Sequence, residues 1–349
     1  MKLFKLREDY SPHPFKWWHI PLLILLIGGT VYIALTSCTN PASTYRQNEG
    51  AVFGTFYHVT YCSNNDLKSN IEGALDEVDQ SLSPFNPNSV ITAINNNTST
   101  ETDSMFRAVF TLAEKVSQAT DGAFDITCAP LVNAWGFGFK NAENVDSAMI
   151  DSLLQFVGYK QVALQGTQII KQDPRTMLDC SAIAKGYGVD AVALCLEKEG
   201  VTDYMVEIGG EVRVKGVNPK GEPWRIGVNK PQPDSLSVNG PELQEVLTVT
   251  DISLATSGNY RNFYIKNNKR YAHTIDPRKG FPVEHSLLSA TVLAKDCATA
   301  DAYATAFMVM GLDKAKQLLS KQKDIKAYFI YSTPEGENAV WYSDGLIDN

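Results

Sequence analysis

The stretch CATADAYATAF, residues 297–307, predicts a buried helix that presents a carboxylate and a hydroxyl group on one face. Asp301 and Thr305 are four residues apart, so on a helix both side chains point the same way. The residues around them are small or apolar, which predicts that this face is buried. A buried carboxylate needs a partner, and two hard oxygen atoms aimed at one point suit Mg²⁺ better than Zn²⁺. The alternative is an ion pair between Asp301 and a Lys or Arg, with Thr305 bonded to its own helix.

The composition excludes classes of protein but selects no function. The chain has 349 residues, of which 44% are hydrophobic and 20% charged, as is usual for a globular protein. Its formal net charge of −8 leaves no basic surface for a polyanion, so we expect no nucleic-acid partner.

The N-terminus has the pattern of an export signal. Basic residues precede an apolar run over 17–35, which ends in Leu-Thr-Ser-Cys. This order is typical of a signal peptide, and Leu-Thr-Ser-Cys resembles a bacterial lipobox. We therefore expect a signal peptide over 1–37, lipidation of Cys38, and a lipoprotein anchored to the inner membrane and facing the periplasm. An uncleaved membrane anchor is the alternative, since the run approaches the length of a spanning helix.

The cysteines beyond Cys38 show no pattern of a disulfide framework or of a zinc site. No CxxC pair and no Cys/His metal spacing links them, and their number is odd. We expect scattered thiols, without a disulfide or a zinc ion.

Helical and strand patterns alternate irregularly after residue 50. Apolar residues at helical spacing predict helices over 67–82, 105–116, 181–199, 297–307 and 313–321. Runs rich in β-branched and aromatic residues predict strands over 51–62, 203–208, 211–216, 224–229, 247–254, 286–294, 325–331 and 339–343, with a hairpin over 262–274 that turns at Asn267-Asn268.

Several of these strands follow one another directly, which predicts an α+β fold rather than a doubly wound parallel sheet. We expect a single catalytic domain over 51–349, built on a mixed, largely antiparallel sheet with packed helices. Residues 38–50 are predicted to be the lipidated Cys and a tether. The Pro-, Gly- and Ser-rich segment 230–243 is predicted to be an exposed excursion within the domain.

The segment LDCSAIAKGYGVD, residues 178–190, combines charged and very small side chains. Asp179 ends a strand-like run, and Lys185 follows on the first turn of a helix. The alanines and glycines between them would let the backbone approach a ligand closely, and a helix start beside a Lys favours an anion. Tight packing between helices is the alternative explanation.

Two further segments carry polar residues among small or apolar ones. DGAFDITCAPLVNAWGFG, residues 121–138, places Asp125 before a Gly/aromatic loop that could surround a flat ring or simply turn a corner. In the segment 253–283, Thr256-Ser257-Gly258 offers hydroxyl groups and open backbone to phosphate oxygens. His273 lies where a strand meets a loop, a common place for functional residues, although a lone His is often structural.

Taken together, these segments resemble the ApbE family of FAD:protein FMN transferases over residues 50–343. The resemblance rests on eight segments in order: AVFGTFYHVTY, SLSPFNPNSVITAIN, DGAFDITCAPLVNAWGFG, LDCSAIAKGYGVD, MVEIGGEVRVKG, SLATSGNYRN, YAHTIDPRKGFPV and CATADAYATAFMVMG.

The resemblance implies a reaction in which a Ser or Thr hydroxyl of a target protein attacks the FMN phosphorus of FAD. AMP leaves, and FMN stays on the target through a phosphoester. The metal ligands implied for Mg²⁺ are the main-chain oxygen of Ala182, the carboxylate of Asp301 and the hydroxyl of Thr305. The catalytic residues would be Asp301 and His273, the latter as the group that activates the hydroxyl, a task that an Asp near the metal could also perform.

The residues that the resemblance implies for FAD form two sets. The first set would contact FAD and consists of Ala123, Phe124, Asp125, Asp179 and Lys185. The second set would lie beside the flavin or adenine ring and consists of Phe53, Phe85 and Ile275. The family usually has Met at the position of Phe53, which should alter ring packing, and an acidic residue can occur at the position of Lys185.

Two other functions use the same pocket: an FAD-binding or scavenging lipoprotein, and a Mg²⁺-dependent FAD pyrophosphatase that yields FMN and AMP. A binding module has no need of a metal held against the scissile phosphate, so Asp301 and Thr305 favour chemistry. The resemblance favours the transferase, with an exported subunit of a membrane redox complex as the expected acceptor.

Overall fold

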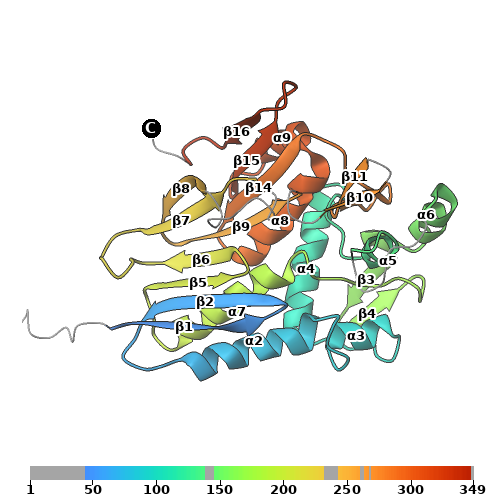
Figure 1. Ribbon diagram of the computed structural model, residues 1–349. Coiled ribbons are helices and arrows are strands. Elements are labelled where there is room, and N and C mark those ends of the chain that lie inside the picture. The colour runs from blue at the N-terminus through green and yellow to red at the C-terminus, as the bar shows by residue number, and fades with distance from the viewer. Residues whose placement is uncertain (1–43, 138–144, 232–242, 260–262, 267–268, 347–349) are drawn as a thin grey trace, which may run out of the picture. The chain divides into compact units, whose positions relative to one another are not determined.

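An eight-stranded antiparallel sheet is the framework of the protein, seen here in a computed structural model that describes residues 44–137, 145–231, 243–259, 263–266 and 269–346 (Figure 1). The strand order is β1-β2-β5-β6-β9-β14-β15-β16, and every neighbouring pair is antiparallel. The strands are β1 Tyr45–Val52, β2 Thr55–Cys62, β5 Tyr204–Ile208, β6 Glu211–Lys215, β9 Ile252–Gly258, β14 Leu287–Ala294, β15 Lys326–Ser332 and β16 Asn338–Tyr342. The predicted α+β fold with a largely antiparallel sheet is confirmed.

Helices cover one face of this sheet, and short strand pairs surround it. The helices are α2 Lys68–Leu82, α3 Val90–Asn95, α4 Ser104–Ala119, α5 Ala129–Ala134, α6 Ser147–Leu154, α7 Ala184–Lys198, α8 Cys297–Met310 and α9 Leu312–Leu319, with a 3₁₀ turn η2 at Tyr159–Gln161. The short pairs are β3 Val162–Gln165 with β4 Gln168–Lys171, β7 Trp224–Asn229 with β8 Leu243–Val249, β10 Phe263–Lys266 with β11 Lys269–Ala272, and β12 Ile275–Asp276 with β13 Phe281–Pro282. Helix α7 packs on β5 and β6, and α8 packs on β9 and β14.

Helix α8 is buried along almost its whole length because its sequence is rich in alanine. Small side chains let it approach both the sheet and α7 closely, and the apolar residues around Asp301 all lie in the core. The helix begins where Asp296 accepts a hydrogen bond from the main-chain N–H of Thr299 at 2.9 Å, and it ends at Gly311, whose φ is 76°. The helix predicted over 297–307 is therefore confirmed, and it continues to Met310.

A buried carboxylate fixes the start of α8 against α7. Asp190 of α7 accepts hydrogen bonds from the main-chain N–H groups of Cys297 at 3.0 Å and Ala298 at 2.9 Å. The guanidinium of Arg213 donates to the same carboxylate at 2.8 Å. Asp190 therefore satisfies two of the N–H groups that a helix leaves unpaired at its start.

Two of the predicted strands are each divided by a turn, and only the first of them forms a hairpin. The strand predicted over 51–62 divides at Phe53 and Gly54, which have φ of 51° and 73° and form the turn between β1 and β2. The strand predicted over 247–254 divides in the same way at Asp251, whose φ is 50°. The tether predicted over 38–50 is wrong from Tyr45 onward, because Tyr45–Val52 pairs with β2. Polar side chains fit there because β1 is an edge strand of the sheet.

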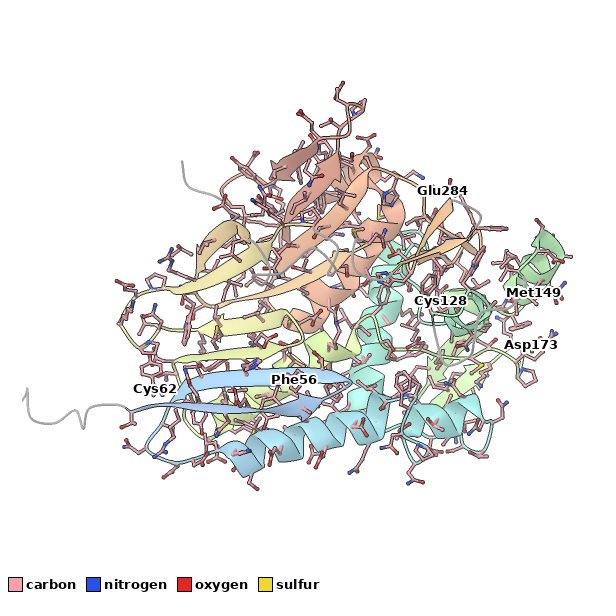
Figure 2. The ribbon with its side chains drawn as sticks, in the orientation of Figure 1. Phe56, Cys62, Cys128, Met149, Asp173 and Glu284 are labelled. Carbon is pink, nitrogen blue, oxygen red and sulfur yellow. The ribbon has the colours of Figure 1, made fainter. Side chains whose placement is uncertain are left out.

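Some predictions fall on residues outside the described ranges. These are the signal peptide over 1–37, the lipidation of Cys38, the Asn267-Asn268 turn and most of the excursion over 230–243. Strands β10 and β11 form the predicted hairpin around that turn. Within the described ranges, no helix is long and apolar enough to cross a bilayer. The cysteines of the described residues are free thiols, and Figure 2 shows Cys62 and Cys128 in separate parts of the fold.

Candidate active site

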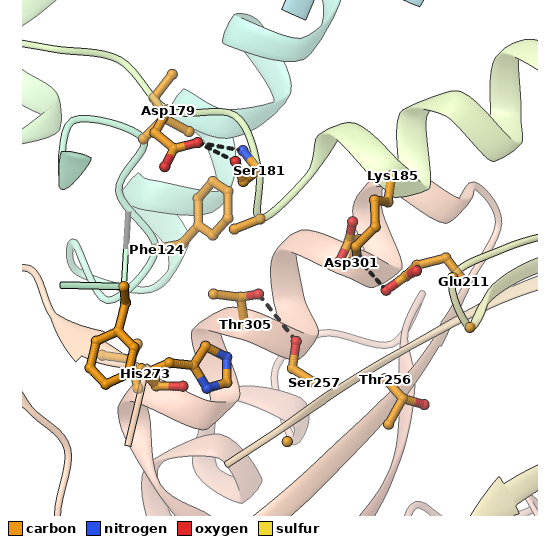
Figure 3. Close-up of a pocket in the computed structure, with 18 of the residues that line it drawn as sticks. Phe124, Asp179, Ser181, Lys185, Glu211, Thr256, Ser257, His273, Asp301 and Thr305 are labelled. Atoms are coloured by element: carbon orange, nitrogen blue, oxygen red, sulfur yellow. Dashed lines mark hydrogen bonds and ion pairs between the residues drawn. The ribbon is translucent and has the colours of Figure 1, made fainter. Parts of the chain in front are cut away.

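A cavity of about 710 Å³ lies where the start of α7 and one side of α8 meet the end of β9 (Figure 3). Its other walls come from the loop before α5, from the turn between β5 and β6, and from the segment that follows β11. The predicted site residues that line it are Phe85, Ala123, Phe124, Asp125, Asp179, Ala182, Lys185, His273, Ile275, Asp301 and Thr305. Folding thus brings into one cavity residues that span most of the described chain.

Asp301 and Thr305 both face this cavity from one side of α8, as their spacing predicts. The side chain of Asp301 is almost wholly buried, and its Oδ2 accepts a hydrogen bond from the main-chain N–H of Gly186 at 3.0 Å. The hydroxyl groups of Thr305 and Ser257 lie 3.2 Å apart. Helix α8 therefore presents a carboxylate and a hydroxyl one turn apart at the cavity wall.

Lys185 lies between two buried carboxylates. Its ammonium donates to Glu211 Oε1 at 2.6 Å and lies 4.0 Å from Asp301 Oδ1. Burial lowers the pKa of Lys185, but the charges of Asp301 and Glu211 outweigh this effect and raise it above its ordinary value. Burial raises the pKa of both Asp301 and Glu211, while the Lys185 ammonium acts in the opposite direction. The sequence left open an ion pair between Asp301 and a Lys. The structure contains this contact with Lys185, but at a longer distance than the contact between Lys185 and Glu211.

The oxygen atoms at this point fit a hard divalent cation. Asp301 supplies a carboxylate and Thr305 a hydroxyl, and Ala182, with its main-chain oxygen, lines the same cavity. Glu211 Oε2 is buried and has no hydrogen-bond partner within the described residues. The described part of the chain contains no cluster of three or more His, Cys, Asp or Glu side chains arranged for a metal. The donors at this wall are all oxygen atoms, the ligand type that hard cations such as Mg²⁺ prefer.

The two predicted acidic contacts with a ligand differ in how their oxygens are used. Asp125 Oδ1 accepts from the main-chain N–H and the hydroxyl of Thr127, and its Oδ2 accepts from the N–H of Tyr159 at 2.6 Å. The carboxylate of Asp125 therefore holds its own loop in place at the cavity wall, and the contact of Asp125 with FAD stays a prediction. Asp179 uses only Oδ1, which accepts from the N–H and the hydroxyl of Ser181.

Phe53 does not line the cavity, so its predicted place beside the ring of a ligand is corrected. Its ring packs against Gly188 of α7, where an added Cβ would lie 2.7 Å from the Phe53 ring. The left-handed backbone at Phe53 and Gly54 turns this side chain into the core, where it contacts both of the larger hydrophobic clusters.

Aromatic and aliphatic side chains form the other walls of the cavity. Ala123, Phe124 and Ile275 are buried beside it, whereas the side chain of Phe85 is 74% exposed. The rings of Phe137 and His273 meet edge to face, with their centroids 6.4 Å apart. These walls provide apolar surface for a flat ring, and Phe85 provides it at the edge that faces solvent.

Glu211 is the residue of this site that the sequence did not single out. It follows Gly209 and Gly210, whose φ values of 59° and 102° make the tight turn between β5 and β6. A carboxylate directly after a Gly-Gly pair, at the first position of a predicted strand, was the available signal. Its partner Lys185 is distant in the sequence, so the pairing itself could not be read from local spacing.

Comparison with known proteins gives one consistent result. Residues 53–329 match the ApbE family. The chain is 35% identical to an FAD:protein FMN transferase of Vibrio cholerae, over 91% of this chain and 95% of that protein. It is 34% identical to an FAD:protein FMN transferase of Haemophilus influenzae, over 89% of this chain and 94% of that one. The solved structure of the flavin transferase ApbE from Vibrio cholerae superposes with a TM-score of 0.78 at 32% identity and covers 87% of this chain and 98% of that one.

Proposed function

The chain belongs to the ApbE family, and on this premise we propose that it transfers FMN from FAD to a Ser or Thr hydroxyl of a target protein, with Mg²⁺ as the cofactor. The observation that carries the proposal is the pair of Asp301 and Thr305, which α8 presents one turn apart at the wall of the cavity. The hydroxyl oxygen forms a new bond to the FMN phosphorus, the bond between the two phosphates breaks, and AMP leaves.

Asp301, Thr305 and the main-chain oxygen of Ala182 would hold the cation. When bound, Mg²⁺ would neutralise charge on the pyrophosphate as its bridge breaks. Lys185 places a further positive charge at the same wall, where a phosphate oxygen of FAD can approach it. Thr256 and Ser257, at the end of β9, also line the cavity and would offer hydroxyl groups to the phosphates, that of Ser257 beside Thr305.

His273 is our candidate for the group that takes the proton of the attacking hydroxyl. It lines the cavity, and the ring of Phe137 lies against it. An imidazole that is neutral near physiological pH can accept a proton from a hydroxyl as the oxygen attacks. The walls formed by Phe124 and Ile275 would border a flat ring of FAD and keep water from that part of the cavity.

The compartment and the acceptor follow from the N-terminus. The basic and apolar pattern before Cys38 supports an exported lipoprotein that faces the periplasm from the inner membrane. An acceptor in the same compartment would be a subunit of a membrane redox complex that carries a target Ser or Thr.

The test is an assay with the purified full-length chain, FAD, Mg²⁺ and a flavin-acceptor domain. We expect flavin fluorescence on the acceptor after denaturing electrophoresis, together with release of AMP. Free FMN with an unlabelled acceptor would instead indicate a pyrophosphatase, and intact FAD would indicate a binding protein.

Asp301→Ala is the decisive variant for the metal assignment. We expect it to abolish transfer while the far-ultraviolet circular dichroism and the thermal unfolding remain those of a folded protein. Asp313→Ala is the matched control, because Asp313 is an exposed carboxylate on the neighbouring helix α9. Unchanged turnover in the Asp301 variant would remove the metal assignment.

A further inference from the structure

Glu211 and Asp301 share a single ammonium group, and they share it unequally. Lys185 Nζ lies 2.6 Å from Glu211 Oε1 but 4.0 Å from Asp301 Oδ1. Glu211 is 3% exposed and Asp301 is 2% exposed, so water screens neither carboxylate appreciably. Figure 3 shows the three side chains converging at one end of the cavity.

We propose that Glu211 is a positioning residue that holds Lys185 away from Asp301 and so keeps the Asp301 carboxylate available to a divalent cation. This inference rests on the proposed function, in which Asp301 is a ligand of that cation. An ammonium bonded to Asp301 Oδ1 would occupy a lone pair that the cation needs. Because the Lys side chain is long and flexible, the loss of its Glu211 partner would let it close the gap to Asp301.

The second oxygen of Glu211 supports this assignment. Glu211 Oε2 is buried without a hydrogen-bond partner among the described residues, and Glu211 lines the cavity. Two carboxylates against one ammonium leave an excess of negative charge at this wall. A buried carboxylate in such a position is costly unless a positive group approaches it. A further cation beside Lys185 would offset this charge.

The turn before Glu211 fixes where its carboxylate lies. The N–H of Gly210 donates to Glu207 Oε1 at 2.6 Å, and both glycines of the turn have positive φ. Glu207 Oε2 in turn lies 2.7 Å from Nδ1 of His58, which is opposite Glu207 on the neighbouring strand β2. Hydrogen bonds therefore fix the turn that precedes Glu211, and this turn fixes the position of the carboxylate that binds Lys185.

The test measures Mg²⁺ binding to the full-length chain by isothermal titration calorimetry, without FAD, so that its result does not depend on turnover. The variants are Glu211→Gln, Lys185→Met and the double variant. Glu211→Gln should weaken Mg²⁺ binding by about tenfold or more where Lys185 is present, the size expected for coupled charged neighbours. Where residue 185 is Met, the same change should weaken binding by no more than about threefold.

Lys185→Met alone should tighten Mg²⁺ binding, because the competing ammonium is removed while both carboxylates remain. This result does not require the Glu211 variant to fold, and thermal unfolding reports on the fold of each variant. Glu197→Gln is the matched control, since Glu197 pairs with Lys215 at 3.1 Å and neither residue lines the cavity. We expect it to leave Mg²⁺ binding unchanged.

An equal effect of Glu211→Gln in both backgrounds would overturn the inference, because it would show simple loss of charge without any action through Lys185. Weaker Mg²⁺ binding in the Lys185→Met variant would also overturn it. In both of these cases the proposed transferase would stand. Failure of the wild-type chain to bind Mg²⁺ in the calorimeter would overturn both this inference and the metal assignment of the proposed function.

Discussion

Gly186 lies so close to Cys297 that there is no room for a side chain between α7 and α8. A Cβ on Gly186 would collide with the main-chain oxygen of Cys297 and would lie 2.8 Å from the Cβ of Asp301. The same glycine donates its N–H to Asp301 Oδ2. The close crossing of the two helices therefore sets the position of Asp301 relative to Lys185, the residue that precedes Gly186 on α7.

Gly186→Ala should force α7 and α8 apart. We expect a loss of about 1–3 kcal/mol in the free energy of unfolding, as for overpacking elsewhere in protein cores, together with a marked loss of transfer activity. Urea denaturation and the acceptor assay measure the two effects. Gly73→Ala in α2 is the control, because nothing lies within 4 Å of its added Cβ. That change should stabilise the chain by up to about 1 kcal/mol, and destabilisation by both changes would contradict the packing argument.

Thr305 tests whether the hydroxyl on α8 is needed. Thr305→Val keeps the shape of the side chain and removes the oxygen, whereas Thr305→Ser keeps the oxygen. We expect Thr305→Val to lower the rate of FMN transfer at limiting Mg²⁺ by about 100-fold, as is typical when a group in the shell of a metal is lost. Thr305→Ser should retain most of the rate. Equal rates in the two variants would argue against a role for this hydroxyl.

His273 is tested by separating catalysis from binding. His273→Gln should lower kcat for transfer by about 100-fold, the contribution usual for a general base, while KM for FAD changes by less than about threefold. Initial rates across a range of FAD concentrations give both constants. His285→Gln serves as a control, because His285 does not line the cavity. An unchanged kcat in the His273 variant would argue against His273 as the general base. Asp301 would then be the candidate for the group that accepts the proton of the attacking hydroxyl.

His285 makes the stability of the fold sensitive to acid. Its Nδ1 accepts from the N–H of Leu287 at 3.2 Å, so its Nε2 carries the proton and donates to the Met308 oxygen at 2.7 Å. Burial lowers the pKa of His285 below its ordinary value, although the bond to Met308 acts in the opposite direction. The unfolded chain therefore binds the proton first as the pH falls.

The free energy of unfolding should accordingly decrease below about pH 6.5, the ordinary pKa of a histidine. Denaturation with urea at several pH values between about 7.5 and 5.5 measures this slope. His285→Gln keeps a donor for the Met308 oxygen and removes the titration, so it should flatten the slope. The same slope in the variant and the wild type would assign the acid sensitivity to other groups.

Local patterns in the sequence predicted the elements whose signals are complete within a few residues. The spacing of Asp301 and Thr305 and the alanines around them were enough to predict α8 from a single short segment. The turn at Phe53 and Gly54 was not predicted, because Gly54 is a single glycine among the aromatic and β-branched residues that flank it closely.

The pairings that connect distant parts of the chain could not be predicted in this way. The hydrogen bond from the Tyr159 N–H to Asp125, which holds the loop of Asp125 in place, joins residues far apart in the sequence. The same is true of the contact between Lys185 and Glu211. The topology of the sheet and the crossing of α7 and α8 bring such partners together. A short segment of the sequence contains no information on either of these features.

The cavity lining begins at Phe85 and ends at Val309, on α8 close to the C-terminal end of the described chain. A nascent or clipped polypeptide that ends before α8 would lack the helix that carries Asp301 and Thr305, together with one wall of the cavity. Ribosomes must therefore translate through α8, whose last residue is Met310, before all walls of the cavity can be assembled.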